Sequence, residues 1–209
     1  MKTVLFVIIS FITISVKAQQ RTVAECTVTF ELSTDSTKNK QLYNALKNTT
    51  KVLYIKGNLS RTDLIARNYL QTIFINKDTS DIVVLRHIGE NKLITNLSRK
   101  KWLALNNLYD SVVFTPSNET KKITGYDCKK LTCTLKNGDS YSLFYATAIT
   151  PSIKDYEYLF RKVPGLVLEY EIKQPNGNTV KYTASKINLS PVPSSKMEIP
   201  AIGYRLVEE

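Results

Sequence analysis

The sequence predicts a mainly β protein: a single antiparallel sheet of about ten strands, curled into a half-open β-barrel, with one or two short helices as a lid. Three observations lead to this prediction. Apolar and polar residues alternate along most of the chain, turn sequences separate the alternating runs, and several runs are apolar on both faces. Alternation is typical of strands because successive side chains of a strand point to opposite faces.

The first strand is expected at residues 23–32. Every second residue from Ala24 to Leu32 is apolar, and the residues between them are Glu or Thr. From residue 35 to residue 50 this alternation stops, and the apolar side chains there, such as Leu42 and Leu46, fit a short helix or a structured loop.

Further strand-like runs follow in quick succession. They cover residues 51–56, 62–67, 71–76, 81–87, 92–97, 110–114, 128–135, 141–147, 165–173 and 178–189. Three turn sequences between them predict hairpins, namely Gly89-Glu90-Asn91, Asn137-Gly138-Asp139 and Pro175-Asn176-Gly177.

A second helix is expected at residues 99–108, where Trp102, Leu105 and Leu108 recur at helical spacing. A polar loop is expected around residues 116–118. The three prolines in the tail of the chain indicate that the tail runs extended over the surface.

Some strands are apolar at every position, as in residues 52–55, 82–85 and 143–146. An antiparallel sheet with one face in water does not repeat this pattern, and two short helices cannot cover so many strands. The sheet is therefore expected to curl around an apolar interior, which is either a filled core or a ligand pocket.

If the interior is a pocket, it would hold an acyl chain, a lipid or another apolar molecule. Aromatic side chains on the two-sided strands are the candidate lining residues, and two side chains of the second helix would form the lid. The predicted set is Tyr54, Phe74, Phe144, Tyr145, Trp102 and Leu105.

The first eighteen residues are typical of a secretory signal peptide. Lys2 supplies the positive charge, residues 4–14 are almost entirely apolar, and Val16-Lys17-Ala18 fits a cleavage site between Ala18 and Gln19. The apolar run is shorter than the roughly 20 residues of a permanent transmembrane helix. The mature chain is thus expected to be one domain, residues 19–209, without a transmembrane span, exported to the periplasm, to the outer membrane or out of the cell.

The chain is basic, with a net charge of +11, and loss of Lys2 and Lys17 with the signal peptide lowers it to +9. Two interpretations stay open. The charge either favours anionic partners such as lipid headgroups and acidic glycans, or scattered lysines simply keep the protein soluble. The basic residues never form a long block, so no nucleic-acid partner is expected.

Three cysteines leave at least one thiol unpaired within the chain. Cys128 and Cys133 are roughly 16 Å apart on an extended strand, and a disulfide needs less than about 7 Å between Cα atoms. A disulfide between Cys26 and Cys133 is the better candidate, because both fall on apolar strand faces. The alternative is that all three cysteines are small buried hydrophobic residues.

The sequence contains no recognisable catalytic or cofactor motif. His87 is the single histidine, and no G-x-S-x-G nucleophile motif, glycine-rich phosphate loop or zinc-ligand spacing accompanies it. A non-enzymatic protein without metal or cofactor is expected. It would be either a carrier of an apolar ligand or an interaction protein of the cell envelope, binding an envelope protein through its basic surface or an edge strand.

Three segments resemble, in the same order, motifs of the GLPGLI-type exported proteins of Gram-negative bacteria. They are residues 123–130 (ITGYDCKK), 143–147 (LFYAT) and 163–169 (VPGLVLE). That family carries a GY-x-C-K-K segment, an aromatic strand with tryptophan or tyrosine, and a PGLVLE strand. The sequence departs from it at Lys162-Val163, where the family has Gly-Leu, and at Phe144 or Tyr145, where the family has tryptophan.

The resemblance is concentrated in residues 120–189. The family is similar in turn to proteins with the lipoprotein-carrier (LolA/LolB-like) fold, a half-open β-barrel with helices plugging its mouth. The resemblance implies this fold and export, and it implies little about activity. The motif residues also have structural explanations: Pro164 can open a strand, and Gly165 allows a tight entry into it.

Overall fold

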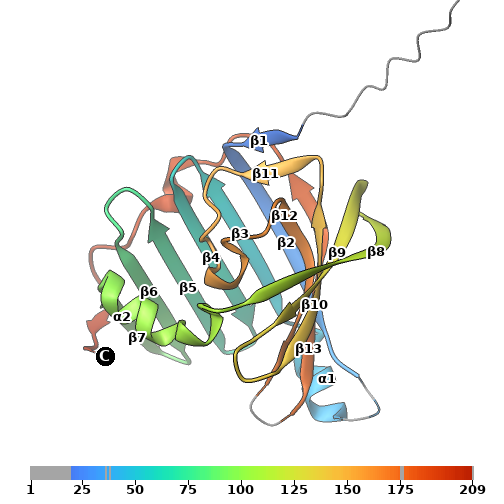
Figure 1. Cartoon of the computed structure of the whole chain (residues 1–209). Helices are drawn as coiled ribbons and strands as arrows, with labels where there is room; N and C mark the ends of the chain where they lie inside the picture. Colours follow the sequence, from blue (N-terminus) through green and yellow to red (C-terminus); the bar gives the residue numbers. More distant parts are fainter. Residues whose placement is uncertain (1–19, 36, 38, 175–176, 209) are drawn as a thin grey trace, which may run out of the picture.

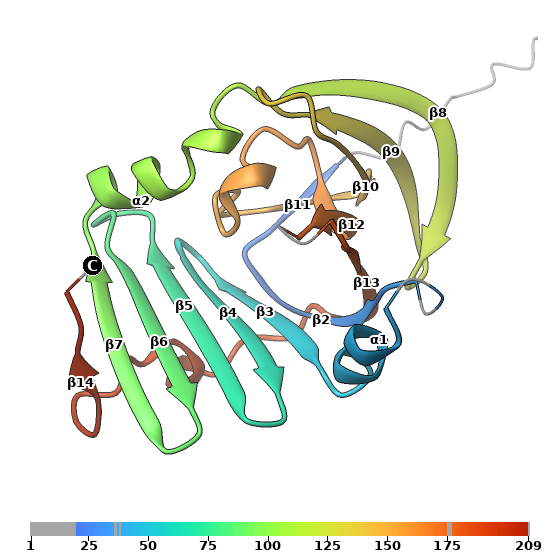
Figure 2. The same ribbon diagram turned by 90° about the horizontal axis from the view of Figure 1, so that it is seen from below.

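The computed structural model describes residues 20–35, 37, 39–174 and 177–208. The predicted signal peptide and its cleavage site at Ala18-Gln19 lie outside the described residues. Twelve strands form one continuous sheet, in the order β14-β7-β6-β5-β4-β3-β2-β13-β12-β10-β9-β8. Figure 1 and Figure 2 show that this sheet bends into an arc. The prediction of a mainly β fold with one curled sheet and short helices is confirmed.

The sheet has more strands than the ten or so expected. Its strands are β2 (Glu25–Ser33), β3 (Thr50–Lys56), β4 (Leu59–Ala66), β5 (Tyr69–Asn76), β6 (Ile82–Ile88), β7 (Asn91–Leu97), β8 (Val113–Ile123), β9 (Tyr126–Thr134), β10 (Ser140–Ala146), β12 (Leu166–Lys173), β13 (Thr179–Asn188) and β14 (Arg205–Leu206). Strand β14 pairs parallel to β7, and the other neighbours in the sheet are antiparallel. A separate parallel pair joins β1 (Arg21–Val23) to β11 (Ile149–Pro151).

The predicted hairpins exist. Strands β6 and β7 pair across the Gly89 turn, and β9 and β10 pair across the Gly138 turn. Both glycines have positive φ angles, 59° and 87°, which L residues with a side chain rarely adopt. Strands β12 and β13 also pair as predicted, although residues 175–176 of their turn lie outside the described residues.

Two helices form, one where a short helix or a structured loop is expected and one at the predicted second helix, and each has a side-chain cap at its N-terminus. Asn39 Oδ1 accepts a hydrogen bond from the Leu42 backbone N–H at 2.8 Å and begins α1 (Lys40–Leu46). Ser98 Oγ accepts from the Lys101 N–H at 3.2 Å and begins α2 (Arg99–Leu105), which a 3-10 turn, η1 (Asn107–Tyr109), continues. Such caps satisfy N–H groups that the helix itself leaves unpaired.

The expected polar loop at residues 116–118 is wrong, because these residues belong to the eleven-residue strand β8. The pairing of β8 with β9 shifts register between Pro116 and Thr120. Proline cannot donate to the ladder, so the strand accommodates it at an irregularity on the edge of the sheet.

Two segments cover the concave face of the arc (Figure 2). One is α2 with η1. The other is the connection between β11 and β12, residues 152–165, which carries the 3-10 turn η2 (Tyr158–Phe160). Ile153 and Phe160 of this connection are buried in the main apolar core. The sequence pattern contained no prediction for this connection.

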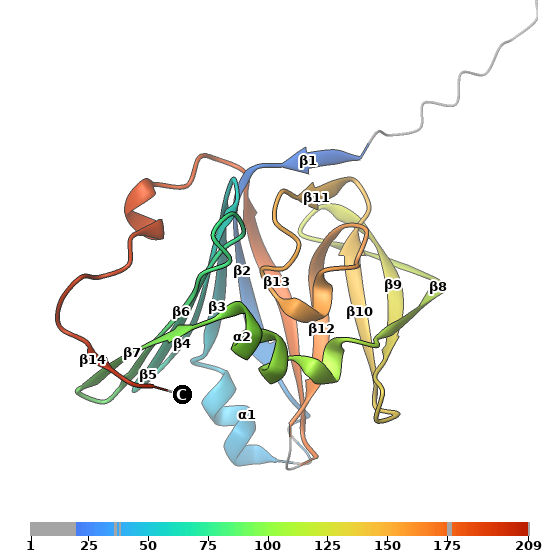
Figure 3. The ribbon, with the colours of Figure 1, turned by 60° about the vertical axis from the view of Figure 1, so that its left-hand side comes forward.

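The C-terminal segment, residues 189–208, runs along the opposite, convex face (Figure 3). It contains the 3-10 turn η3 (Ser194–Met197) and ends beyond β14. On this face Phe74, Val83 and Leu85 form a second apolar cluster, against which Tyr204 packs. On β5 and β6, the apolar side chains of both faces are therefore covered, by the curled core on one face and by the tail on the other.

The predicted disulfide between Cys26 and Cys133 is wrong, since all three cysteines are free and buried. Cys26 lies on β2 and Cys133 on β9, and β13, β12 and β10 separate these strands in the sheet. The alternative of three buried hydrophobic cysteines is confirmed.

Within the described residues, no helix has the length and apolar character needed to cross a membrane.

Candidate functional site

A cavity of about 260 Å³ lies on the concave face of the sheet, beneath α2, η1 and the 152–165 connection. Its wall is formed mainly by aromatic and aliphatic side chains, with a few polar groups among them. The lining residues are Lys51, Thr62, Leu64, Gln71, Ile73, Trp102, Asn106, Tyr109, Tyr156, Glu157, Tyr158, Leu159, Tyr170, Ile172 and Tyr182.

Lys51 of β3 places a charge in this apolar wall. Only 7% of the residue is exposed, because it lies on the same strand face as the core residues Leu53 and Ile55. Its Nζ forms an ion pair with Glu157 of the connection and donates a hydrogen bond to the Tyr170 hydroxyl at 2.6 Å. A buried ammonium needs such partners, because an unpaired buried charge is strongly destabilising.

Aromatic rings surround the same ammonium. Its distances to the ring centroids of Tyr170, Tyr182 and Phe30 are 5.0, 5.5 and 5.9 Å. The rings of Tyr170 and Tyr182 stack with centroids 4.6 Å apart and an interplanar angle of 3°. Cation–π attraction adds to the ion pair, since both tyrosine rings present electron-rich faces.

The hydroxyls of these two tyrosines stay protonated. Burial raises the pKa of Tyr170 well above its ordinary value, and the negative charge of Glu157 adds to the effect. The same two causes raise the pKa of Tyr182 to about 12. At physiological pH both side chains are therefore neutral, and each can donate and accept a hydrogen bond.

The two segments that cover the cavity are tied to each other. The Tyr158 hydroxyl donates to the Asp110 carboxylate next to η1. Arg161 donates to the Tyr158 carbonyl at 2.8 Å, and the Arg161 guanidinium lies 3.8 Å from the Tyr158 ring centroid. Arg99 of α2 forms an ion pair with Asp155 at 3.6 Å. These contacts hold the cover in one arrangement over the sheet.

Trp102 contributes a donor that has no acceptor. Its Nε1–H is buried and makes no hydrogen bond among the described residues. The backbone carbonyl of the same residue accepts from the Asn106 side chain at 2.9 Å. The Tyr156 hydroxyl, which also lines the cavity, is likewise buried without a hydrogen-bond partner among the described residues. A buried N–H without a partner is uncommon and indicates a bound acceptor, either water or a ligand.

Of the predicted lining residues, Trp102 lies in the cavity wall. Tyr54 and Phe74 were placed on the wrong face: they lie on the convex face, on either side of Arg61, at 5.7 and 5.3 Å from its guanidinium carbon. The Lys196 ammonium, on the C-terminal segment, also lies 5.6 Å from the Tyr54 ring centroid. Alternation separates two faces but does not say which face is concave.

The other three predictions of lining residues are also wrong for this cavity. Leu105 points to solvent and is 55% exposed. Phe144 is buried beneath the Lys121 ammonium, 4.2 Å from its ring centroid, and Tyr145 lies against Gly165. These aromatic side chains belong to the packing between β8, β9, β10 and β12.

Sequence reasoning missed Lys51, Glu157, Tyr170 and Tyr182. A signal existed for Lys51, since it stands in phase with Leu53 and Ile55 on an apolar face. No periodicity marked Glu157, because its segment is irregular.

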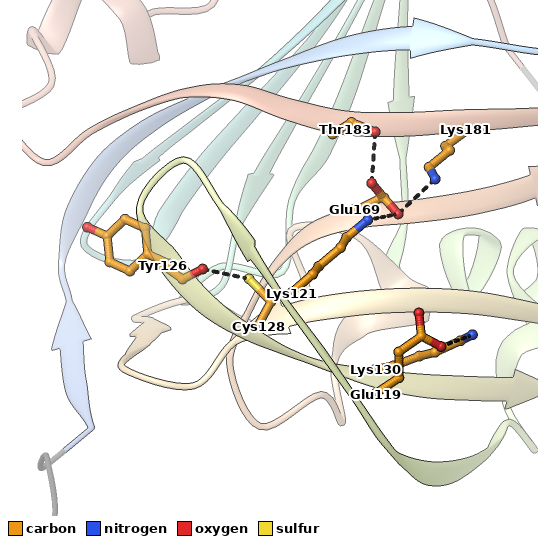
Figure 4. A network of polar contacts seen from close by, with 8 residues as sticks. All are labelled: Glu119, Lys121, Tyr126, Cys128, Lys130, Glu169, Lys181 and Thr183. Carbon is orange, nitrogen blue, oxygen red and sulfur yellow. Dashed lines mark hydrogen bonds and ion pairs between the residues drawn. The ribbon is translucent and has the colours of Figure 1, made fainter.

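A buried carboxylate lies outside the cavity, at Glu169 of β12 (Figure 4). It accepts from Lys121 at 2.5 Å, from Lys181 at 3.0 Å and from Thr183 at 3.1 Å. Burial alone would raise the pKa of the Glu169 carboxyl, but the hydrogen bonds and charges of the two lysines outweigh burial and lower it. All of its partners are side chains of β8 and β13, so this cluster joins strands and is satisfied as it stands.

The described residues contain no group of three or more His, Cys, Asp or Glu side chains placed to hold a metal ion. His87, the single histidine, contacts the Tyr204 hydroxyl through Nε2 at 2.5 Å and does not line the cavity.

No family model and no curated protein matches the chain. Among solved structures, PNGF-II is similar with a TM-score of 0.50 and 16% identity, over 88% of this chain and 31% of that one. MucB in complex with MucA(peri) is similar with a TM-score of 0.43 and 10% identity, over 85% of this chain and 54% of that one. The MucA/MucB complex of Pseudomonas aeruginosa is similar with a TM-score of 0.36 and 9% identity, over 85% of this chain and 56% of that one.

The chain thus spans less than two thirds of each of these solved chains. At such low identity, the likeness to PNGF-II concerns the fold alone. The resemblance to GLPGLI-type proteins stays a prediction.

Proposed function

We propose that this chain is an exported, non-catalytic binding protein whose concave-face cavity holds a small amphipathic ligand, one with an apolar body and a polar end. The observation that carries the proposal is the cavity itself, an aromatic-walled space with a buried lysine at one point of its wall. Ligand sites typically combine a mostly apolar lining with a few placed polar groups.

The size of the cavity sets the class of ligand. Its volume of about 260 Å³ is near the lower end of the usual range of roughly 300–1,000 Å³. A single medium-length acyl chain or a molecule of similar bulk fits this range better than a complete phospholipid. The unpaired Trp102 N–H favours a ligand that carries a hydrogen-bond acceptor.

A binding role is favoured over catalysis by the state of the polar groups. The ammonium of Lys51 is neutralised by Glu157, and the tyrosine hydroxyls beside it are held protonated. Nucleophilic or general-base catalysis needs an activated group, which this arrangement does not supply.

The proposal is tested by native mass spectrometry of protein purified from its own envelope fraction. Leu64 and Ile65 are neighbours on β4, and of the two Leu64 lines the cavity, whereas Ile65 is exposed. We expect a co-purifying small molecule in the wild type and in Ile65→Trp, and its loss in Leu64→Trp, which fills the cavity. Ligand-free wild-type protein that also binds no added amphiphile would contradict the proposal.

The alternative function is an interaction protein of the envelope. Strand β8 favours it, because it is an end strand of the sheet, is eleven residues long and exposes the apolar side chain of Val113. End strands offer unpaired backbone groups to a second chain. A photo-crosslinker at Ser117 that captures one defined protein partner in cells, together with ligand-free purified protein, would favour this alternative.

A further inference from the structure

The position of Glu157 identifies the chemical class of the ligand's polar end. Lys51 and Tyr170 belong to strands of the sheet, β3 and β12, whereas Glu157 belongs to the irregular connection that covers the cavity. Lys51 and its acceptor Tyr170 are thus part of the wall, and the carboxylate that pairs with Lys51 is supplied by the cover.

We propose, building on the proposed function, that the Glu157 carboxylate occupies the binding position of an acidic headgroup. The ligand is then an anionic amphiphile whose own carboxylate replaces Glu157 on Lys51 and also accepts from the Tyr170 hydroxyl.

Burial shows which partner of the pair can leave. The Lys51 side chain is 9% exposed and the Glu157 side chain 26%. The carboxylate therefore lies at the boundary between the cavity and solvent, and it can be hydrated when it leaves the lysine. The lysine lies inside the wall and cannot be hydrated in the same way, so an anion must stay beside it.

Charge balance makes the exchange selective. A ligand carboxylate brings the same single negative charge that Glu157 contributes, so the buried ammonium stays neutralised throughout. A neutral amphiphile cannot take this place, because it would leave Lys51 without a counter-ion.

The hydroxyl of Tyr170 completes the site. Its oxygen accepts from Lys51 Nζ, which leaves its own hydrogen free to donate to an acceptor in the cavity. A carboxylate at this point would accept from an ammonium and a phenol together, and both bonds are charge-assisted.

The experiment compares octanoate with octan-1-ol, which have the same chain length and differ in charge, by isothermal titration at pH 7.5. We expect the wild type to bind octanoate about tenfold more tightly than octan-1-ol, in the range of a single charge-assisted hydrogen bond. Glu157→Gln removes the internal competitor and should strengthen octanoate binding a further tenfold or so, so that the preference for octanoate over octan-1-ol widens.

Two further variants serve as controls. Lys51→Met should abolish the preference for octanoate. Glu25→Gln alters another carboxylate that pairs with a lysine of β3, Lys56 at 3.3 Å, away from the cavity lining, and should bind like the wild type. If Lys51→Met does not fold, the wild type and Glu157→Gln carry the comparison by themselves.

Two results would overturn this inference while leaving the proposed function intact. One is equal binding of the two amphiphiles by the wild type. The other is octanoate binding that is weaker in Glu157→Gln than in the wild type, or the same. Failure of both amphiphiles to bind the wild type and Glu157→Gln would overturn the proposed function as well.

Discussion

The Lys51 ammonium lies 2.6 Å from the Tyr170 hydroxyl, although 119 residues separate the two in the chain. Their strands, β3 and β12, are not neighbours, since β2 and β13 lie between them. Three strand spacings amount to roughly 14 Å along a sheet, so the two side chains meet because they lean toward each other over a concave surface. The curl of the sheet thus creates the polar point of the cavity.

The first prediction concerns the stability of the Lys51–Glu157 pair. Glu157→Gln leaves a buried ammonium without its counter-ion and should lower the free energy of unfolding by about 1–3 kcal/mol. Adding Lys51→Met removes that unpaired charge and should recover at least half of the loss. The wild type, both single variants and the double variant form a double-mutant cycle. Urea unfolding of these four proteins measures the interaction free energy between Lys51 and Glu157.

The control for this cycle is the exposed pair of Lys122 and Asp127, at 3.8 Å, whose side chains are 67% and 85% exposed. Solvent screens such a pair, so Asp127→Asn should leave unfolding unchanged. Additive losses in the Lys51–Glu157 cycle would show that the two groups do not interact in solution.

The second prediction concerns Gly165, at the start of β12. A Cβ atom there would lie 2.1 Å from the Ala146 carbonyl oxygen and 2.8 Å from Tyr145 Cδ2. Because the closest atom is backbone, Gly165→Ala should destabilise the protein by about 2 kcal/mol or more.

Gly138→Ala is the comparison for Gly165→Ala. Gly138 has a φ of 87° and open space around its Cα, so alanine there meets backbone strain of about 1 kcal/mol and no clash. Thermal unfolding of both variants separates the two causes, and a smaller shift for Gly165→Ala than for Gly138→Ala would contradict the close approach.

The third prediction concerns pH. Burial lowers the pKa of His87, and the charge of Lys92 lowers it further. The unfolded chain, with a histidine pKa near 6.5, then binds the proton more tightly than the folded chain does. Stability is therefore fully present above about pH 6.5 and falls as the pH drops below it.

The melting temperature should be lower at pH 5.5 than at pH 7.5, and His87→Gln should show a smaller difference. Carboxylates such as Glu169, whose pKa is lowered, lose their contribution only below their ordinary values near 4, so they do not affect this window. An equal drop in wild type and variant would assign the pH dependence to other groups.

The fourth prediction concerns the thiols. Burial raises the pKa of Cys26 and of Cys133 to about 12 and that of Cys128 to about 11. The reactive form is the thiolate, so folded protein at pH 8 should not react with iodoacetamide. Unfolded protein should take up three alkyl groups without prior reduction, one for each cysteine. Uptake of a single group would reveal a disulfide.

Sequence patterns predicted the hairpins and the second helix because these depend on local signals. Turn glycines such as Gly89 and Gly138 act within a few residues, and so does the spacing of apolar residues along a helix. Trp102 was predicted in the same way, from helical spacing on a segment expected to form the lid.

The rest of the site depends on contacts between distant segments. Glu157 lies in an irregular connection whose position is determined by burial of residues such as Phe160. Tyr54 and Phe74 were misplaced because the tail, which covers their face, shows no periodicity that would pair it with the sheet. Alternation predicts that a strand has two faces, and only tertiary packing decides which of them surrounds the cavity.

Trp102 reports directly on a ligand in the cavity, because it is the single tryptophan of the chain and lines the cavity. Its fluorescence is followed while delipidated protein is titrated with octanoate. We expect a saturable change in emission that Leu159→Ala, which alters another part of the cavity lining, weakens and that the exposed Ile88→Ala leaves unchanged. Emission that stays constant in the wild type up to millimolar octanoate would contradict a ligand site on the concave face.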